Sequence, residues 1–393
     1  MTKVCFCVRN DFHHKFGGDT LQISKYIENS PDGFECEIVT YSHFKDHKAH
    51  FHNSYDIFVL TNIDRCYEYL GFYTELRKNV DCSRLVVLPI HHSQIYVESY
   101  YLKFHPLLWR PIKLFGGILF IEKIKSLIHM IRENGDKKIP YLGLLLSNYK
   151  SLIAESLVKC AGWICIAEGE ANSIKSDFGI DKPIKYSICQ NGADINSSSN
   201  FGDRNIDILV CGRIEKRKNQ LEVAKLLSKS PYKVCFVGAL NENHKQYSKE
   251  FLDIIGANKN LFYLGKKSPQ EISQLYLDAK LHLSASWFEV SSLVDLEAYI
   301  HGCYVVSSKN GYTSEILDQH SLTLIDPSNL IDLVETVEKV LNSNRNDLDS
   351  RHRSGGLNTW KKSAEDFFSG IQSITATSHS KLNPGDTPMG QAS

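Results

Sequence analysis

The sequence has none of the features that would point to a nucleic-acid binder or a disulfide-rich secreted protein. Its 393 residues carry 45 Lys+Arg and 45 Asp+Glu, so no net charge favours nucleic acid or an acidic partner. The 11 Cys are odd in number, form no C-x-x-C pair and mostly lie in apolar runs. We therefore expect reduced core cysteines, not disulfides or a zinc site. No G-x-G-x-x-G is present, which argues against a dinucleotide oxidoreductase.

Long apolar runs are also missing. The best candidate for a membrane span, Leu114 to Ile121, is far shorter than a bilayer requires. The first residues enter a strand-like run, Val4 to Val8, without a signal peptide. We expect a cytoplasmic protein, placed at the inner face of the membrane if it meets a lipid-linked substrate.

What is present is a regular alternation of short apolar runs and amphipathic segments, which predicts an α/β fold with parallel sheets. The length suits two domains. We expect an N-terminal domain at 1–196, a Ser/Asn/Gly-rich linker, a second domain at 206–357, a helix at 358–374 and a disordered tail at 375–393. The expected strands are 4–8, 37–41, 57–61, 85–89, 162–167, 184–189, 206–211, 234–238, 261–265, 281–284 and 323–327.

One stretch, residues 284–298, puts Glu289 and Glu297 on either side of a strand-to-helix junction. Ser292 and Asp295 predict a capping box at the start of a helix over 293–301. The free N–H groups of residues 290–293 and the positive helix end then form a site for an anion such as a diphosphate. Glu297 lies about one turn inside the helix and can reach back toward the same ligand.

A second pattern follows the first strand of the C-terminal half. Gly212-Arg213 ends the buried run 206–211, and Lys218 comes five residues after Arg213. Arg offers a bidentate fork and Lys a point charge, so the pair suits a diphosphate without a metal. The neighbouring run Lys216-Arg217-Lys218 is otherwise read as a solvated charge cluster.

Two further patterns lie at predicted strand ends in the N-terminal half. Gly17-Gly18 separates the first strand from a helix and lets backbone approach a ligand, although a plain turn explains it equally. His91-His92 follows the strand at 85–89, where ligands gather in open α/β sheets. A neutral His92 there can bind a sugar hydroxyl or assist an acceptor, while a structural role for one of the two is equally expected.

These motifs together resemble the retaining family 4 glycosyltransferases of the GT-B fold: Glu-x7-Glu, Gly-Arg-x4-Lys, and Gly311 followed by Glu315. Where that family often has glycine after the first Glu, this chain has Val290-Ser291-Ser292. The resemblance implies two Rossmann-like domains facing across a cleft and transfer of a sugar from a nucleotide sugar to a saccharide or lipid-linked saccharide, as in surface polysaccharide assembly. It implies no cofactor and no metal. It implies catalytic roles for Glu289, Arg213, Lys218 and His92, and donor binding by Gly17, Gly18, Arg213, Lys218, Glu289, Ser291, Ser292, Leu293 and Glu297.

Other interpretations stay open. A nucleotide-sugar 2-epimerase of the same fold and a non-catalytic nucleotide-sugar-binding protein fit the same motifs. Residues 101–138 combine apolar residues with eight basic and three acidic ones. This composition suits contact with an anionic membrane surface, or an ordinary helix packed on the domain.

Overall fold

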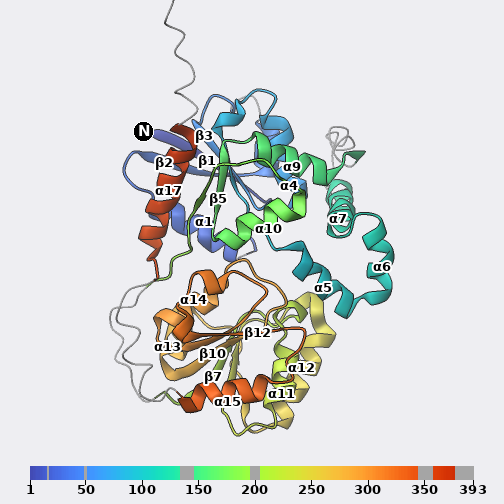
Figure 1. Ribbon diagram of the computed structural model, residues 1–393, viewed down its shortest axis with the longest axis vertical. Coiled ribbons are helices and arrows are strands. Elements are labelled where there is room, and N and C mark those ends of the chain that lie inside the picture. Colours follow the sequence, from blue (N-terminus) through green and yellow to red (C-terminus); the bar gives the residue numbers. More distant parts are fainter. Residues whose placement is uncertain (16, 48–50, 133–145, 195–203, 344–356, 377–393) are drawn as a thin grey trace, which may run out of the picture.

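The computed structural model describes residues 1–15, 17–47, 51–132, 146–194, 204–343 and 357–376. Two α/β domains lie one above the other in Figure 1, each built on a parallel six-stranded sheet. This confirms the predicted fold class. The predicted linker and most of the predicted tail lie outside the described residues.

The first sheet has the order β2-β1-β3-β4-β5-β6. Its strands are short, buried runs rich in Val, Ile, Leu and aromatic residues, as expected where helices cover both faces. One face packs on α2, α4, α9 and α10, and the other on α1 and α17. The strands are β1 (Thr2–Val8), β2 (Phe34–Thr40), β3 (Ile57–Thr61), β4 (Leu85–Leu88), β5 (Gly162–Cys165) and β6 (Tyr186–Ile188). The helices of this half are α1 (Gly18–Glu28), α2 (Tyr41–Asp46), α4 (Cys66–Leu76), α5 (Gln94–Phe104), α6 (Pro106–Leu114), α7 (Ile118–Arg132), α9 (Tyr149–Lys159) and α10 (Glu168–Phe178).

The second sheet has the order β12-β11-β10-β7-β8-β9 and is covered in the same way, by α11, α12 and α15 on one face and by α13 and α14 on the other. Its strands are β7 (Ile206–Cys211), β8 (Val234–Val237), β9 (Leu261–Tyr263), β10 (Ala279–Ser284), β11 (Tyr304–Ser308) and β12 (Leu322–Ile325). The helices are α11 (Gln220–Leu227), α12 (Lys245–Ala257), α13 (Pro269–Asp278), α14 (Leu293–Ile300) and α15 (Leu333–Ser343). In both sheets the strand order reverses beside the first strand, which is where ligands bind in such folds.

The last helix, α17 (Trp360–Ala376), returns to the first domain and lies beside α1 in Figure 1. Phe367 stacks on Tyr26 with ring centroids 4.4 Å apart and on Phe6 at 5.7 Å. The helix continues two residues beyond the predicted end at 374 because Ile371 and Ile374 still pack in the first domain's core.

Direct contacts also join the domains. The N–H of Gly169, in the first turn of α10, donates to the Glu315 carboxylate at 3.0 Å. Tyr312 donates through its hydroxyl to Ser173 at 2.9 Å. A carboxylate is favoured at a helix N-terminus, so the contact of Glu315 with Gly169 stabilises the packing of the second domain against the first. The cleft between the domains is therefore bounded by specific bonds.

Candidate active site

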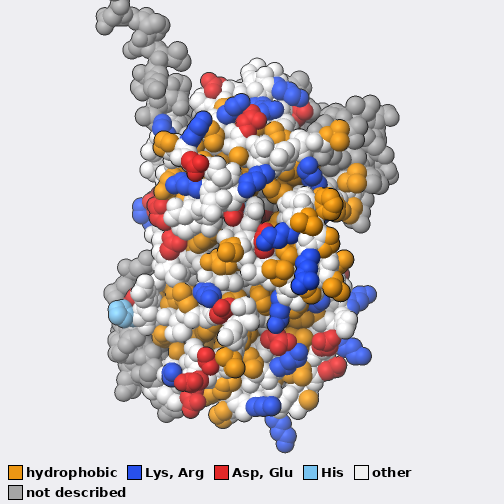
Figure 2. All heavy atoms as spheres, turned by 45° about the vertical axis from the view of Figure 1, so that its right-hand side comes forward, with side chains coloured by type: hydrophobic (Ala, Val, Ile, Leu, Met, Phe, Trp, Pro, Cys, Tyr) orange, Lys and Arg blue, Asp and Glu red, His pale blue; other side chains and the backbone are white. Residues whose placement is uncertain are grey.

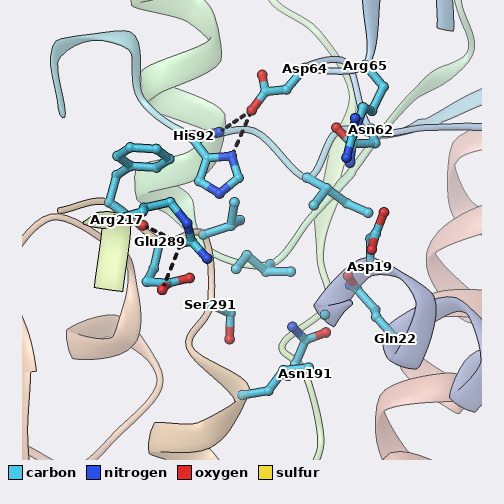
Figure 3. A pocket seen from close by; sticks show the side chains of 16 residues that line it. Asp19, Gln22, Asn62, Asp64, Arg65, His92, Asn191, Arg217, Glu289 and Ser291 are labelled. Atoms are coloured by element: carbon cyan, nitrogen blue, oxygen red, sulfur yellow. Dashed lines mark hydrogen bonds and ion pairs between the residues drawn. The ribbon is translucent and has the colours of Figure 1, made fainter. Parts of the chain in front are cut away.

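A pocket of about 310 Å³ lies in the cleft, lined by both domains. The loops after β3 and β4 form one side, and the loop from β10 to α14 forms the other (Figure 3). Carboxyl ends of parallel strands are the usual place for ligands in α/β folds. The lining residues are Gly18, Asp19, Gln22, Asn62, Asp64, Arg65, Ile90, His92, Ile166, Asn191, Arg217, Phe288, Glu289, Val290, Ser291 and Leu293.

The first-domain wall rests on a chain of histidines and carboxylates. His91 is buried, with Nδ1 2.6 Å from Asp64 Oδ1 and Nε2 2.9 Å from Asp177 Oδ2. Burial lowers the pKa of His91, but the two carboxylates outweigh it and raise that pKa to about 10. His91 is therefore an imidazolium that donates from both ring nitrogens. The pKa of Asp64 lies far below its usual value, because both histidines offset its burial.

The same Asp64 fixes His92. Its Oδ2 accepts from the backbone N–H of His92 at 2.9 Å and from the ring Nδ1 at 2.8 Å. The other ring nitrogen, Nε2, points away from Asp64 toward the pocket (Figure 3). Phe288 of the second domain packs edge-on against the His92 ring at 5.2 Å. The first histidine is thus structural, and the second faces the cleft.

The backbone around this pair is unusual. Asn62 and Ile90, which follow β3 and β4, have positive φ angles of 61° and 48°. Such conformations cost free energy for residues other than glycine and concentrate at functional sites. Below them, the buried Glu170 carboxylate accepts from the backbone N–H groups of His91 and Ile166, both at 2.8 Å. Burial raises the pKa of Glu170 to about 7.

The second-domain wall is an ion-pair cluster around Glu289. Its Oε1 accepts from Lys218 and, at 3.0 Å, from Arg217. Burial raises the pKa of Glu289, but the two cations outweigh it and lower that pKa to about 2. Arg217 also pairs with Glu215 and lies over the Phe288 ring at 5.5 Å. The alternative interpretation of Lys216-Arg217-Lys218 as a solvated charge cluster does not hold for Arg217 and Lys218, because both side chains donate to Glu289.

Below Glu289 the chain enters α14 with polar groups left unused. The hydroxyls of Ser291 and Ser292 have no hydrogen-bond partner within the described part of the chain, although both are buried atoms. The first backbone N–H groups of a helix also lack intrahelical partners. Together they offer donors to an anion at this helix end, as the sequence predicts.

The predicted capping box at this helix is wrong. The Ser292 side chain makes no capping hydrogen bond. Asp295 is fully buried and instead lies 3.0 Å from His282 Nε2 and accepts from the Ser307 hydroxyl. Those partners belong to β10 and β11, and no local sequence pattern predicts their contacts with Asp295. The Ser292 hydroxyl is consequently left for another partner.

The predicted glycine pair starts α1. Gly18 lines the pocket, and a Cβ there would lie 3.7 Å from the Leu293 side chain across the cleft. Gly17 precedes the helix in an extended conformation and does not line the pocket. The loop between them and β1 is tied by Arg9, whose Nε donates to Asp19 at 2.8 Å. The backbone can therefore approach a ligand from a fixed position.

The structure does not bring all the predicted residues to one place. Gly18, His92, Glu289, Ser291 and Leu293 line the pocket. Lys218 reaches it through Glu289. The remaining predicted residues, Arg213, Glu297, Ser292 and Gly17, do not line it.

Glu297 and Arg213 come from different elements of the second domain. Glu297 is partly buried, and its carboxylate has no hydrogen-bond partner within the described ranges. Burial together with Asp194 raises the pKa of this carboxyl to about 7. Arg213 is exposed and follows Gly212 at the end of β7. Their roles stay predictions.

Several pocket residues are absent from the sequence-based site: Asp64, Arg65, Asn62, Arg217 and Asn191. The position of Asn62, directly after β3, and of Asp64 two residues later is a signal that strand-end reasoning could have used. The sequence offers no feature that distinguishes Arg217 from its basic neighbours Lys216 and Lys218.

Two Rossmann-like domains that face each other across this cleft define the GT-B class of glycosyltransferase folds. Residues 193–355 match the family model of the glycosyl transferases group 1. The matched residues cover the second domain. No curated protein matches the chain in a sequence search. Membership of family 4 in particular stays a prediction.

Solved structures agree on the fold. Sucrose-phosphate synthase from Thermosynechococcus elongatus matches with a TM-score of 0.63 at 10% identity, over 97% of this chain and 98% of that one. HepE from Anabaena, solved with UDP, gives 0.61 at 14% identity, over 97% and 99%. The lipopolysaccharide outer core galactosyltransferase WaaB gives 0.55 at 12% identity, over 97% and 100%. At these identities the similarity shows the fold alone.

Proposed function

We propose that this protein transfers a glycosyl group from a nucleotide sugar to a saccharide or lipid-linked saccharide, with retention at the anomeric carbon and without a metal. The observation that carries the proposal is the Glu289 cluster. Glu289 and Arg217 line the pocket, and Lys218 donates to Glu289 from behind, next to a helix end whose Ser291 and Ser292 hydroxyls have no partner among the described residues. A ligand with a diphosphate next to sugar hydroxyls needs both kinds of group.

In this proposal the diphosphate of the donor lies at the start of α14. Lys218 and Arg213 supply positive charge to its oxygens, and they stabilise the charge that grows as the glycosidic bond to the diphosphate breaks. Lys218 donates to Glu289. When the donor binds, the Lys218 ammonium group would therefore contact both the Glu289 carboxylate and the diphosphate.

The two glutamates then recognise opposite flanks of the donor. Glu289 stays ionised at neutral pH and accepts from hydroxyls of the transferred sugar. Glu297 accepts from the ribose hydroxyls. The hydroxyl of the acceptor attacks on the face of the leaving group, its proton passes to the diphosphate, and a new glycosidic bond replaces the broken one. His92, held by Asp64, faces this reaction from the first domain.

The structure of HepE with UDP and glucose supports a nucleotide sugar as the donor class. It does not name the base for this chain, since the identity is 16%.

A membrane-bound acceptor is supported by the surface of α6 and α7, which project from the side of the first domain in Figure 1. Leu107 and Leu114 are 85% and 86% exposed, and Phe115 is 71% exposed. Figure 2 shows hydrophobic and basic side chains gathered on this flank. Arg110 on α6 and Lys103 at the end of the preceding helix α5 have no ion pair to any described residue. Such a surface suits anionic lipid. None of the described helices is long and apolar enough to cross a bilayer.

Sedimentation with vesicles tests this surface. The protein should bind vesicles that contain anionic lipid at low salt and leave them at high salt, because screening weakens the attraction of Lys and Arg. Leu107→Gln combined with Leu114→Gln should abolish binding, whereas Leu252→Gln, exposed on α12 of the other domain, should not. Equal binding to neutral vesicles would contradict the electrostatic part.

Product analysis tests the proposed reaction. The protein is incubated with a panel of nucleotide sugars, first alone and then with saccharide acceptors, and the anomeric configuration of any product is assigned by NMR. Slow hydrolysis alone and an α-linked product from an α-linked donor support retaining transfer. An epimerised donor would identify a 2-epimerase, and an unchanged donor throughout would favour a binding protein.

The metal-free mechanism needs its own test, because the sequence holds one Asp-x-Asp, Asp347 and Asp349, outside the described residues. Transfer should survive EDTA, since cations of the chain neutralise the diphosphate. Loss of transfer on chelation that Mn²⁺ or Mg²⁺ restores would overturn this part of the proposal.

A further inference from the structure

A second cavity, of about 370 Å³, adjoins the first. The two share five lining residues, Asp64, Arg65, His92, Arg217 and Phe288, so they meet along one wall. The first cavity extends from this wall toward α14, and the second toward α5 and α7. A molecule in the second cavity would thus approach His92 from the side opposite the donor.

About half of the second cavity's lining is apolar. Its walls come from the end of β3, from α5, from the first turns of α7 and from the end of α10, with Phe288 contributed by the other domain. Such a lining holds a hydrocarbon or the flat face of a ring. The apolar and aromatic lining residues are Ile63, Val97, Tyr101, Ile118, Leu119, Phe178 and Phe288.

The charged side chains in this lining are almost all paired. Asp64 accepts from His91 and His92, and Glu122 pairs with Lys125. Arg217 pairs with Glu215 and Glu289. The exception is Arg65: its guanidinium has no hydrogen bond or ion pair to any residue in the described ranges, and it lines both cavities. An unused guanidinium beside an apolar cavity favours a carboxylate or a phosphate.

We propose that the second cavity binds the acceptor, and that this acceptor has an apolar segment and an anionic group held by Arg65. Its reactive hydroxyl would then face His92 and Glu289 where the cavities meet. The assignment rests on the proposed glycosyl transfer and adds to it the chemical class of the acceptor. A lipid phosphate and a soluble sugar phosphate share the anionic group, and the apolar lining favours the first.

The position of α7 explains how such an acceptor would arrive. Ile118, Leu119 and Glu122 line the cavity, while Ile124, Leu127 and Ile128 on the same helix are exposed. The helix therefore separates the cavity from the apolar surface of α6 and α7. A lipid chain could lie on that surface while the head group enters beneath the helix.

Calorimetric titration with three simple probes tests the site without any donor. The probes are n-octyl phosphate and n-octyl glucoside, both below their micellar concentrations, and inorganic phosphate. Octyl phosphate should bind most tightly. Arg65→Gln should weaken it by about tenfold, the loss of one charge-assisted contact. Ile118→Gln should weaken octyl phosphate and leave inorganic phosphate unchanged. Arg110→Gln, a matched change on exposed α6 outside both cavities, should have no effect.

Three results would overturn the proposal. Octyl phosphate bound equally by the parent and by Arg65→Gln would remove the anionic contact. Octyl glucoside bound as tightly as octyl phosphate would do the same. Inorganic phosphate bound as tightly as octyl phosphate would remove the apolar part and point to a soluble sugar phosphate. Since no titration uses a nucleotide sugar, failure of the transfer assay would count against the proposed function and not against the binding site itself.

Discussion

The two walls of the cleft are built in opposite ways. On the first-domain side, the charges of His91, Asp64 and Asp177 are buried and satisfied by one another. On the second-domain side, the hydroxyls of Ser291 and Ser292 are buried without a partner among the described residues. Unsatisfied buried polar atoms cost free energy unless a ligand or water completes them.

This difference separates two tasks. The network of His91, Asp64 and Asp177 is satisfied within itself, so it can hold His92 in one orientation at no further cost. The second wall is incomplete and gains the most when an anion arrives. Changes in this histidine–carboxylate network should therefore affect folding, and changes in the second wall should affect binding and rate.

The largest expected effect lies in the second wall. Arg213→Ala or Lys218→Ala should lower kcat/KM by about 10²-fold or more, as for loss of a preorganised charge donor. The melting temperature should stay close to that of the parent for Arg213→Ala, because Arg213 is exposed, and for Lys218→Ala because Arg217 still pairs with Glu289. Lys225→Ala is the control, since Lys225 forms only a surface pair with Glu222. Near-normal transfer by either variant would refute the proposed role of Arg213 and Lys218 in binding the diphosphate.

Next comes a stability effect in the first wall. His91→Asn should lower the free energy of unfolding by about 2 kcal/mol, because it leaves two carboxylates without their shared cation. The folded-state pKa of His91 is raised from 6.5 to about 10, so its stabilisation is full below pH 6.5 and is lost as pH rises toward 10. Urea denaturation between pH 6.5 and 10 should show the free energy of unfolding falling with pH in the parent and not in the variant.

His14→Asn is the matched control, since His14 is exposed. If His91→Asn kept full stability and lost only activity, the first wall would be functional in its own right and the comparison would fail.

A smaller and more selective effect separates the two glutamates. Glu297→Gln should weaken binding of the free nucleoside diphosphate by about tenfold, because an amide replaces one charged hydrogen bond by a weaker one. Glu289→Gln should leave that affinity unchanged or slightly higher, since Lys218 loses a competing partner, while it lowers transfer by at least as much. Calorimetry and a transfer assay on both variants decide this. Two variants that behaved like the parent would contradict the proposed roles.

Much of the fold could be predicted from the sequence. The buried runs at β3 and β7 match the predicted bounds, because each is a short β-rich segment between turn residues. Tyr41 was placed in a strand but begins α2, because its ring packs at the edge of the core against Tyr67 and Phe72. Strand ends are where tertiary contacts override local preference.

The site was predictable only where it is local. Glu289 and Ser291 belong to one short stretch, so a spacing could reveal them. Asp64 and Asp177 are far apart in sequence and meet only through His91. Asp295 was assigned to a local cap, and strands distant in sequence took it instead. A network between elements leaves no periodic pattern in the chain.

The smallest expected effect concerns the protonation of Glu297. Burial, with a contribution from Asp194, raises the pKa of this carboxyl to about 7. Ribose hydroxyls donate to the ionised form, so nucleoside diphosphate binding should tighten as pH rises through that value. Between pH 6.5 and 7.5 the ionised fraction grows by about threefold, and so should the affinity.

The terminal phosphate of the ligand titrates nearby, with a pKa of about 6, so Glu297→Gln is needed to measure its share. Between pH 6.5 and 7.5 the affinity of the parent should rise by about threefold more than the affinity of Glu297→Gln. Asp194→Asn removes the nearby like charge and should lower the pKa of Glu297. The pH range over which binding tightens should therefore lie lower than in the parent. Calorimetry at five pH values on these three proteins gives the result. A pH dependence identical in parent and Glu297→Gln would place Glu297 outside the nucleotide site, and the second wall would then recognise the donor through the helix end and the Glu289 cluster.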